Sequence, residues 1–218
     1  MRLADALRPL LPRVPIARLP WRFPDGDTFV LPLVPRDAVW VDLRLPHPRL
    51  GVRPEAPAPS GPATPFQAML AARAVGPLVA VEQAALDRRV TFRFGAAEGF
   101  VPVAAVDLVL ELTGRHGNAI LVDPEGTVLG AWREVGADVN RYRQVRPGLA
   151  YVPPPPYTKL DPRGADPAVV RALLRDRPLA QAHREIDGIG PLGSALWAAR
   201  AGVDPAVPLV DDALEAAV

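Results

Sequence analysis

Segments with a hydrophobic residue at every second position recur along the first two thirds of the chain, and this spacing is typical of half-buried strands. The clearest is residues 38–45, where Val39, Val41 and Leu43 share one face. The other predicted strands are residues 28–33, 78–83, 89–94, 101–112, 118–122 and 127–132. Short strands at a spacing of roughly ten residues favour antiparallel pairing. We therefore predict an α+β fold built on an antiparallel β-sandwich or half-barrel.

A helix is predicted to begin at Thr64 and to pack against this sheet. Thr64 is a favourable N-cap, Pro65 suits the first helical position, and Gln67 can complete a reciprocal capping arrangement. Gly76 and Pro77 are expected to end the helix, because proline cannot continue it and glycine tolerates the turn that follows. The domain should thus contain one helix packed on strands.

Two proline-rich segments interrupt the strand pattern. Residues 46–65 carry seven prolines, which remove backbone donors and restrict torsions, so we predict an exposed loop there. The run from Pro153 to Pro156 cannot continue a central strand and should be extended. We place a domain boundary after this run, with a β-rich domain over residues 1–160 and an all-helical module over residues 161–218.

Helical spacing replaces the strand pattern in the C-terminal module. Helices are predicted from Asp166, over residues 179–186 and through residues 196–199. Between the last two, Gly188, Ile189 and Gly190 resemble the turn of a helix-hairpin-helix motif. Glycines permit a tight turn there, and the amides of the next helix can meet a phosphate. The alternative is a plain connection between two helices.

Composition limits the functions open to this chain. With 49% hydrophobic and 22% charged residues, it is expected to form a globular protein. It contains no cysteine and three histidines, so we expect no metal site, no cofactor and no disulfide. There is no apolar run of about 18 residues and no secretion signal, which favours a cytoplasmic protein without a membrane partner.

Charge and motif searches exclude further classes. The 25 basic and 24 acidic residues leave a net charge of +1, which argues against nucleic-acid binding through overall charge alone. We find no Ser-His-Asp spacing, no phosphate-binding loop and no paired metal carboxylates. We therefore predict that the chain is not an enzyme, with no catalytic residue and no small-molecule substrate.

An ordered set of motifs resembles the NFACT family of ribosome quality-control factors. The set includes the pair Asp87-Arg88, the segment from Glu111 to Asn118, and the segment from Arg146 to Tyr151. The resemblance is to the N-terminal NFACT-N domain of the family and the helix-hairpin-helix part after it. Thr113 and Gly117 depart from the family motif Glu-Leu-Met-Gly-Arg-His-Ser-Asn, so contacts by those two side chains are not carried over.

The resemblance implies partners and site residues. Family members bind large ribosomal subunits that carry stalled peptidyl-tRNA, and in bacteria they recruit alanyl-tRNA to add alanines to the nascent chain. They continue into a coiled coil and a second NFACT domain, for which this chain has no room. The tRNA-contacting positions implied by the resemblance are Asp87, Arg88, Glu111, Arg115, His116 and Asn118.

The chemistry of these residues is compatible with RNA binding. A guanidinium can grip phosphate or stack on a base, and a neighbouring carboxylate can accept a hydrogen bond from a base amine. For Asp87 and Arg88, a local ion pair at a turn is the alternative. Likewise Asn118 can serve only to cap its turn. Both readings are left open by the sequence.

Two other functions also stay open at this stage. Gram-positive relatives have carried the label fibronectin-binding protein, which suggests a surface adhesin. The NFACT-N domain is also similar in fold to the formamidopyrimidine-DNA glycosylases, which suggests a DNA-binding or repair protein. Those enzymes use an N-terminal proline amine followed by glutamate, whereas Arg2 and Leu3 stand here. A glycosylase-like fold without catalysis is therefore the form this alternative takes.

Overall fold

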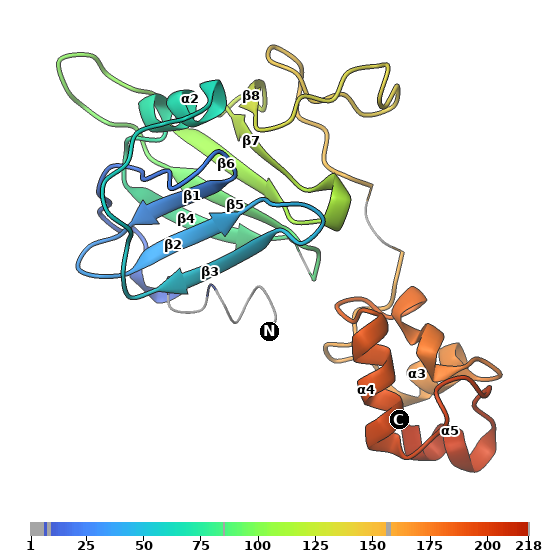
Figure 1. The fold of residues 1–218 in the computed structure, drawn as a ribbon. Helices are drawn as coiled ribbons and strands as arrows, with labels where there is room; N and C mark the ends of the chain where they lie inside the picture. The colour runs from blue at the N-terminus through green and yellow to red at the C-terminus, as the bar shows by residue number, and fades with distance from the viewer. Residues whose placement is uncertain (1–6, 8–9, 85, 156–157, 218) are drawn as a thin grey trace. The chain divides into compact units, whose positions relative to one another are not determined.

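The computed structural model describes residue 7 and residues 10–84, 86–155 and 158–217. The chain divides into two compact units (Figure 1). The first unit comprises Met1–Ala84 and Arg88–Pro154, and the second comprises Ala85–Asp87 and Pro155–Val218. The change of unit thus falls within the proline run. Arg2 and Leu3, on which the glycosylase comparison depends, lie outside the described residues.

A five-stranded antiparallel sheet forms the larger part of the first unit. Its strands follow the chain order, and three of them have the predicted bounds. They are β4 (Leu78–Gln83), β5 (Arg89–Phe94), β6 (Val106–Glu111), β7 (Asn118–Val122) and β8 (Val128–Ala131). Alternation of buried and less buried residues along β5 shows why the period-two pattern located this strand correctly.

The prediction that residues 101–112 form one strand was wrong for its first part. β6 begins only at Val106, opposite Phe94, the last residue of β5. The preceding loop pairs with itself instead, because Ala97 and Val103 exchange backbone hydrogen bonds of 2.9 and 3.0 Å. Pro102, next to that pair, has no amide hydrogen to give to a ladder.

A second antiparallel sheet has three strands in the order β1-β2-β3. They are β1 (Thr28–Pro32), β2 (Ala38–Asp42) and β3 (Arg49–Arg53). The prediction of an unstructured loop over residues 46–65 was wrong at β3. This strand lies between prolines rather than on them, and it pairs Val52 with Val39 and Leu50 with Val41. As an edge strand it tolerates flanking prolines, since only one side of it must donate to the ladder.

The two sheets face each other across one hydrophobic core, so the predicted sandwich and α+β class are confirmed. The helix α2 (Pro65–Arg73) closes this core, with Phe66 edge-on to Phe29 at a ring-centroid distance of 5.9 Å. Its predicted cap is present, since the Thr64 hydroxyl accepts the amide hydrogen of Gln67 at 3.2 Å. The Gln67 side chain reaches back to accept from the amide of Ala63 at 2.7 Å.

The second unit is helical and has its own small core. Its elements are α3 (Pro167–Leu174), the 3-10 helix η3 (Leu179–Arg184), α4 (Pro191–Ala201) and α5 (Asp211–Ala217), while the first unit holds the 3-10 helices η1 (Leu11–Arg13) and η2 (Gly114–His116). Asp166 caps α3 as predicted, accepting from the amide of Ala168 at 2.8 Å. Within the described residues, no helix has the length and apolar character needed to span a membrane.

The helix predicted over residues 179–186 is the short 3-10 helix η3 rather than an α-helix. Its backbone ladder is broken at His183, whose amide donates to the Ser194 hydroxyl at 3.0 Å instead of to the carbonyl four residues earlier. The turn after η3 contains Gly188 with φ +72, a left-handed conformation that glycine adopts without strain. The described residues therefore do not form the predicted pair of α-helices around this turn, because a 3-10 helix precedes it.

Candidate nucleic-acid interface

Two turns of the first unit meet at one end of the five-stranded sheet. In the ladder, Glu111 stands opposite Arg89 on one side and opposite Asn118 on the other. The β4–β5 turn ends just before Arg89, and the β6–β7 turn joins Glu111 to Asn118. The turns also touch directly, since the amide of Leu112 donates to the carbonyl of Arg88 at 2.9 Å.

Three predicted site residues are exposed on these turns: Arg88, Arg115 and His116. We call them the basic patch. Arg115 and His116 belong to the 3-10 helix η2, and the Arg115 Nε donates to the His116 Nε2 at 3.1 Å. Asp87 is half-buried and belongs to the second unit, so it is not counted in the basic patch. The patch can offer several donors to one anionic surface.

Two other predicted site residues, Glu111 and Asn118, are buried, with 2% and 3% of their surface exposed. The Asn118 amide nitrogen donates to the carbonyl of Arg133 at 2.8 Å, and its oxygen accepts from the amides of Arg133 and Ala119 at 2.9 and 3.0 Å. These bonds engage both acceptor positions of the oxygen and one amide hydrogen. Asn118 therefore joins the start of β7 to the segment after β8, whereas the alternative was that it caps the β6–β7 turn itself.

The Glu111 carboxylate is the centre of a buried polar cluster. Its Oε1 accepts a hydrogen bond from the Tyr151 hydroxyl at 2.8 Å and forms an ion pair with Arg143. The Arg143 guanidinium also donates from Nε to the carbonyl of Val152 at 2.6 Å and lies over the Tyr151 ring. Arg143 was not predicted as a partner of Glu111. In the sequence, it stands out only as part of residues 141–163, which hold five Lys or Arg residues and one acidic residue.

Burial and the negative charge of Glu111 raise the pKa of Tyr151 from 10.0 to about 12. A phenol whose pKa is higher in the folded state stabilises that state below its unfolded pKa. We therefore expect the Tyr151 contribution to be complete below pH 10 and to be lost as the pH rises towards 12. Urea unfolding of wild type and Tyr151→Phe between pH 9 and 12 tests this. The stability difference between the two proteins should shrink over that window, and a constant difference would contradict the assignment.

The turn predicted to bind phosphate lies in the second unit. Gly188 has a left-handed conformation, and Gly190 is the N-cap of α4. A side chain at Gly188 would be strained by the left-handed backbone and would also meet the end of the Leu86 side chain at 2.9 Å. Pro191 takes the first helical position, where its missing amide costs nothing. Ile189 is half-buried against the small core of this unit.

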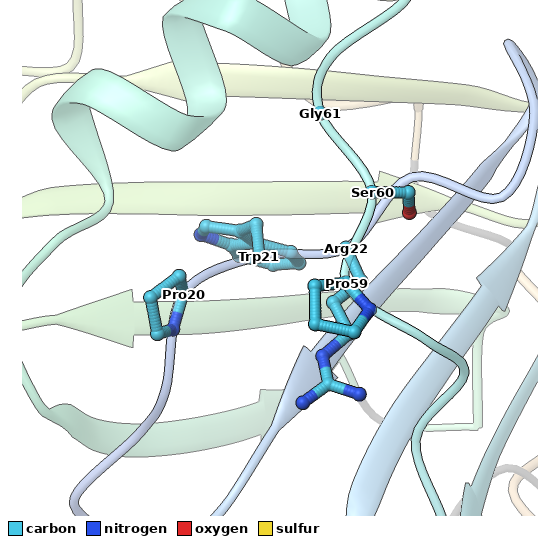
Figure 2. A pocket seen from close by; sticks show the side chains of 6 residues that line it. All are labelled: Pro20, Trp21, Arg22, Pro59, Ser60 and Gly61. Atoms are coloured by element: carbon cyan, nitrogen blue, oxygen red, sulfur yellow. The ribbon is translucent and has the colours of Figure 1, made fainter.

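A shallow hollow of about 360 Å³ lies beside Trp21. Figure 2 shows its lining on two chain segments, with Pro20, Trp21 and Arg22 on one and Pro59, Ser60 and Gly61 on the other. Its polar groups are engaged within the protein. The Trp21 indole donates to the carbonyl of Ala74 at 3.1 Å, and the Ser60 hydroxyl accepts from the amide of Phe23 at 2.9 Å. The hollow therefore presents no convergent polar set for a ligand.

Comparison with known families and proteins places these features in context. The family described as NFACT N-terminal and middle domains matches residues 48–216. The Rqc2 homolog RqcH of Bacillus subtilis is 30% identical over 133 residues, which make up 59% of this chain and 23% of that protein. The Rqc2 homolog RqcH of Streptococcus suis is 41% identical over 56 residues, or 25% of this chain and 10% of that protein. This chain thus spans less than a quarter of these relatives.

Solved structures share the fold at lower identity. The N-terminal part of the fibronectin/fibrinogen-binding protein of Streptococcus suis superposes with a TM-score of 0.77 and 19% identity, covering 99% of this chain and 80% of that one. The fibrinogen binding protein of Staphylococcus aureus gives a TM-score of 0.75 at 20% identity, covering 99% and 77%. These likenesses concern the arrangement of elements alone.

Proposed function

Because this chain belongs to the NFACT family, we propose that it binds tRNA and the large ribosomal subunit as part of ribosome-associated quality control. In this proposal the chain recruits alanyl-tRNA to ribosomal subunits that hold stalled peptidyl-tRNA, so that alanines are added to the nascent chain. Its role is binding rather than catalysis. The cytoplasm is the compartment where these partners occur.

The observation that carries the proposal is the basic patch. The patch residues Arg88, Arg115 and His116 come from two turns. The two arginines are 27 residues apart in the chain (115 minus 88), but the register of the sheet brings their turns together. Guanidinium groups suit phosphate because they present several donors in one plane. In this proposal Glu111 and Asn118 stabilise the turns that carry the patch and do not contact RNA, because both are buried. Asp87 keeps its expected role as acceptor for a base amine.

The second unit supplies a further expected contact. We place the phosphate backbone of RNA at the turn of Gly188, Ile189 and Gly190, where the helix-hairpin-helix resemblance put it. Backbone amides at the start of α4 have no intrahelical acceptors, and the positive end of the helix dipole favours an anion. Contacts of this kind position a nucleic acid without reading its sequence.

A surface adhesin is less well supported. The proteins named for fibronectin or fibrinogen binding share 19% and 20% identity with this chain, which supports a common fold and no more. The RqcH relatives are closer in sequence, at 30% and 41% identity. A ribosome-associated role therefore has the stronger support.

Replacing Arg88 with alanine should weaken tRNA binding about tenfold, because a charged hydrogen bond to phosphate is lost. Each phosphate contact also releases counterions, so the slope of log affinity against log salt should flatten by roughly 0.7 to 0.9. Arg115→Ala should behave in the same way. The measurement is titration of fluorescent tRNA with each protein at several salt concentrations.

The matched control is Arg73→Ala, which removes an exposed arginine from the last turn of α2 and changes the net charge equally. It should leave affinity and slope close to wild type. Equal binding by all four proteins would contradict the assignment of Arg88 and Arg115. Failure of the wild type to bind tRNA would contradict the proposed function for this chain.

A further inference from the structure

Tyr142 is a solvent-exposed aromatic residue. Its surface is 91% exposed, whereas most large aromatic side chains of the first unit lie in the core. Among the described residues, neither its ring nor its hydroxyl has a hydrogen-bond or ring partner. It is followed by Arg143 and preceded by Arg141, which is exposed and makes no ion pair with a described residue.

The loop that carries Tyr142 is fixed at its base and near its tip. Val135 and Val145 exchange two backbone hydrogen bonds of 2.9 Å and close the loop, and Val145 is fully buried. The Asn140 side chain accepts from the amides of Tyr142 and Arg143 at 3.0 and 3.1 Å. A ring displayed on such a preorganised loop loses little conformational freedom when something packs on it.

The loop also lies at the end of the sheet that carries the basic patch. Arg143, the next residue after Tyr142, forms its ion pair with Glu111 at the last position of β6. At the start of the loop segment, the Arg133 guanidinium donates to the carbonyl of Arg115 at 3.2 Å. Tyr142 is therefore next to Arg143, which anchors the loop to the end of β6.

The chemistry of this surface fits a nucleobase. Unpaired bases stack on aromatic side chains, and the exposed Arg141 beside the ring can attract a phosphate that flanks the base. Arg141 next to the ring is exposed and cationic, which favours an anionic partner, and Val139 is the exposed apolar residue of the same loop. Phe100, the other fully exposed aromatic among the residues that the structure describes, lies in the loop after β5, which leaves the sheet at the end opposite to Arg88.

We propose that Tyr142 is a stacking platform for an unpaired base of the RNA that the basic patch holds by its phosphates. The inference rests on the proposed function and adds to it a site that distinguishes single-stranded RNA from duplex. The patch binds the RNA backbone whether or not the bases are paired. The Tyr142 ring stacks only with a base that is not stacked on its neighbours in the RNA.

The test uses a short fluorescent single-stranded RNA and a duplex of the same length, titrated with the full chain. Tyr142→Ala should weaken single-strand binding about tenfold and leave duplex binding nearly unchanged, because stacking contributes only for an unpaired base. Tyr142→Phe should bind like wild type, since it keeps the ring and removes only the hydroxyl. A 2-aminopurine base in the single strand should be quenched by wild type and by Tyr142→Phe, but not by Tyr142→Ala.

The control is Phe100→Ala, which removes an exposed aromatic from the other end of the sheet and should not change either affinity. If Arg88→Ala weakens binding while Tyr142→Ala equals wild type, the stacking proposal is overturned and the proposed function stands. Loss of binding in Tyr142→Phe as great as in Tyr142→Ala would also overturn stacking. If the wild type binds neither RNA, both proposals fail together.

Discussion

Glu111→Ala is expected to lower the free energy of unfolding of the sheet unit by about 3 kcal/mol, because it leaves a largely buried guanidinium without its counter-ion. The Arg143 side chain is only 19% exposed, and Glu111 itself is 2% exposed. The Tyr151 hydroxyl loses its acceptor in the same variant. Urea unfolding followed by tryptophan fluorescence measures the change.

Glu134→Ala is the matched control for Glu111→Ala. This carboxylate is 55% exposed and lies 4.0 Å from Arg146, so its loss should change stability by less than about 0.5 kcal/mol. A result for Glu111→Ala as small as that for Glu134→Ala would mean that the buried cluster does not hold the 133–152 segment on the sheet. In that case, Glu111→Ala should also leave the loop that carries Tyr142 in its native conformation.

Phe29→Ala is expected to cost about 4 kcal/mol, within the range seen for large-to-small changes of buried aromatics. The Phe29 side chain has no exposed surface and packs edge-on against both Phe23 and Phe66, at 6.2 and 5.9 Å between ring centroids. It thus joins β1 to α2 and to the segment before β1. The loss combines the transfer of the ring to water with the cavity it leaves.

The same unfolding measurement on Phe100→Ala provides the comparison. Its ring is fully exposed, so its removal should alter stability by no more than about 0.5 kcal/mol. If Phe29→Ala unfolded at the urea concentration of wild type, the single core that joins the two sheets would be the wrong description of this unit.

Three strands of the large sheet, β4, β5 and β7, had the predicted bounds, and β5 shows the local rule most clearly. β5 buries Val90, Phe92 and Phe94 on one face, and a period of two in the sequence is sufficient to show this. The α2 boundary was predictable for a similar reason, since the cap uses Thr64 and Gln67 only three residues apart. In both cases the stabilising contacts lie within a few residues.

The strand β3 shows where local rules stop. Residues 49–53 alternate, with Leu50 and Val52 on one face, but the segment is short and stands among prolines. It forms a strand because β2 offers an edge for pairing, with Val39 and Val41 opposite Val52 and Leu50. Strand formation at such a segment depends on the partner more than on its own residues.

The sequence by itself determined which residues are chemically able to bind RNA, but the tertiary structure decided which of them are available. Glu111, Arg115 and Asn118 stand close together in one motif, yet burial leaves only Arg115 of the three at the surface. The partner of Glu111 is Arg143, which is 32 residues away in the chain. Side-chain types and local periods are properties of short segments. Burial and long-range ion pairs arise only when distant segments pack, because a segment is buried or paired by the surface of another segment.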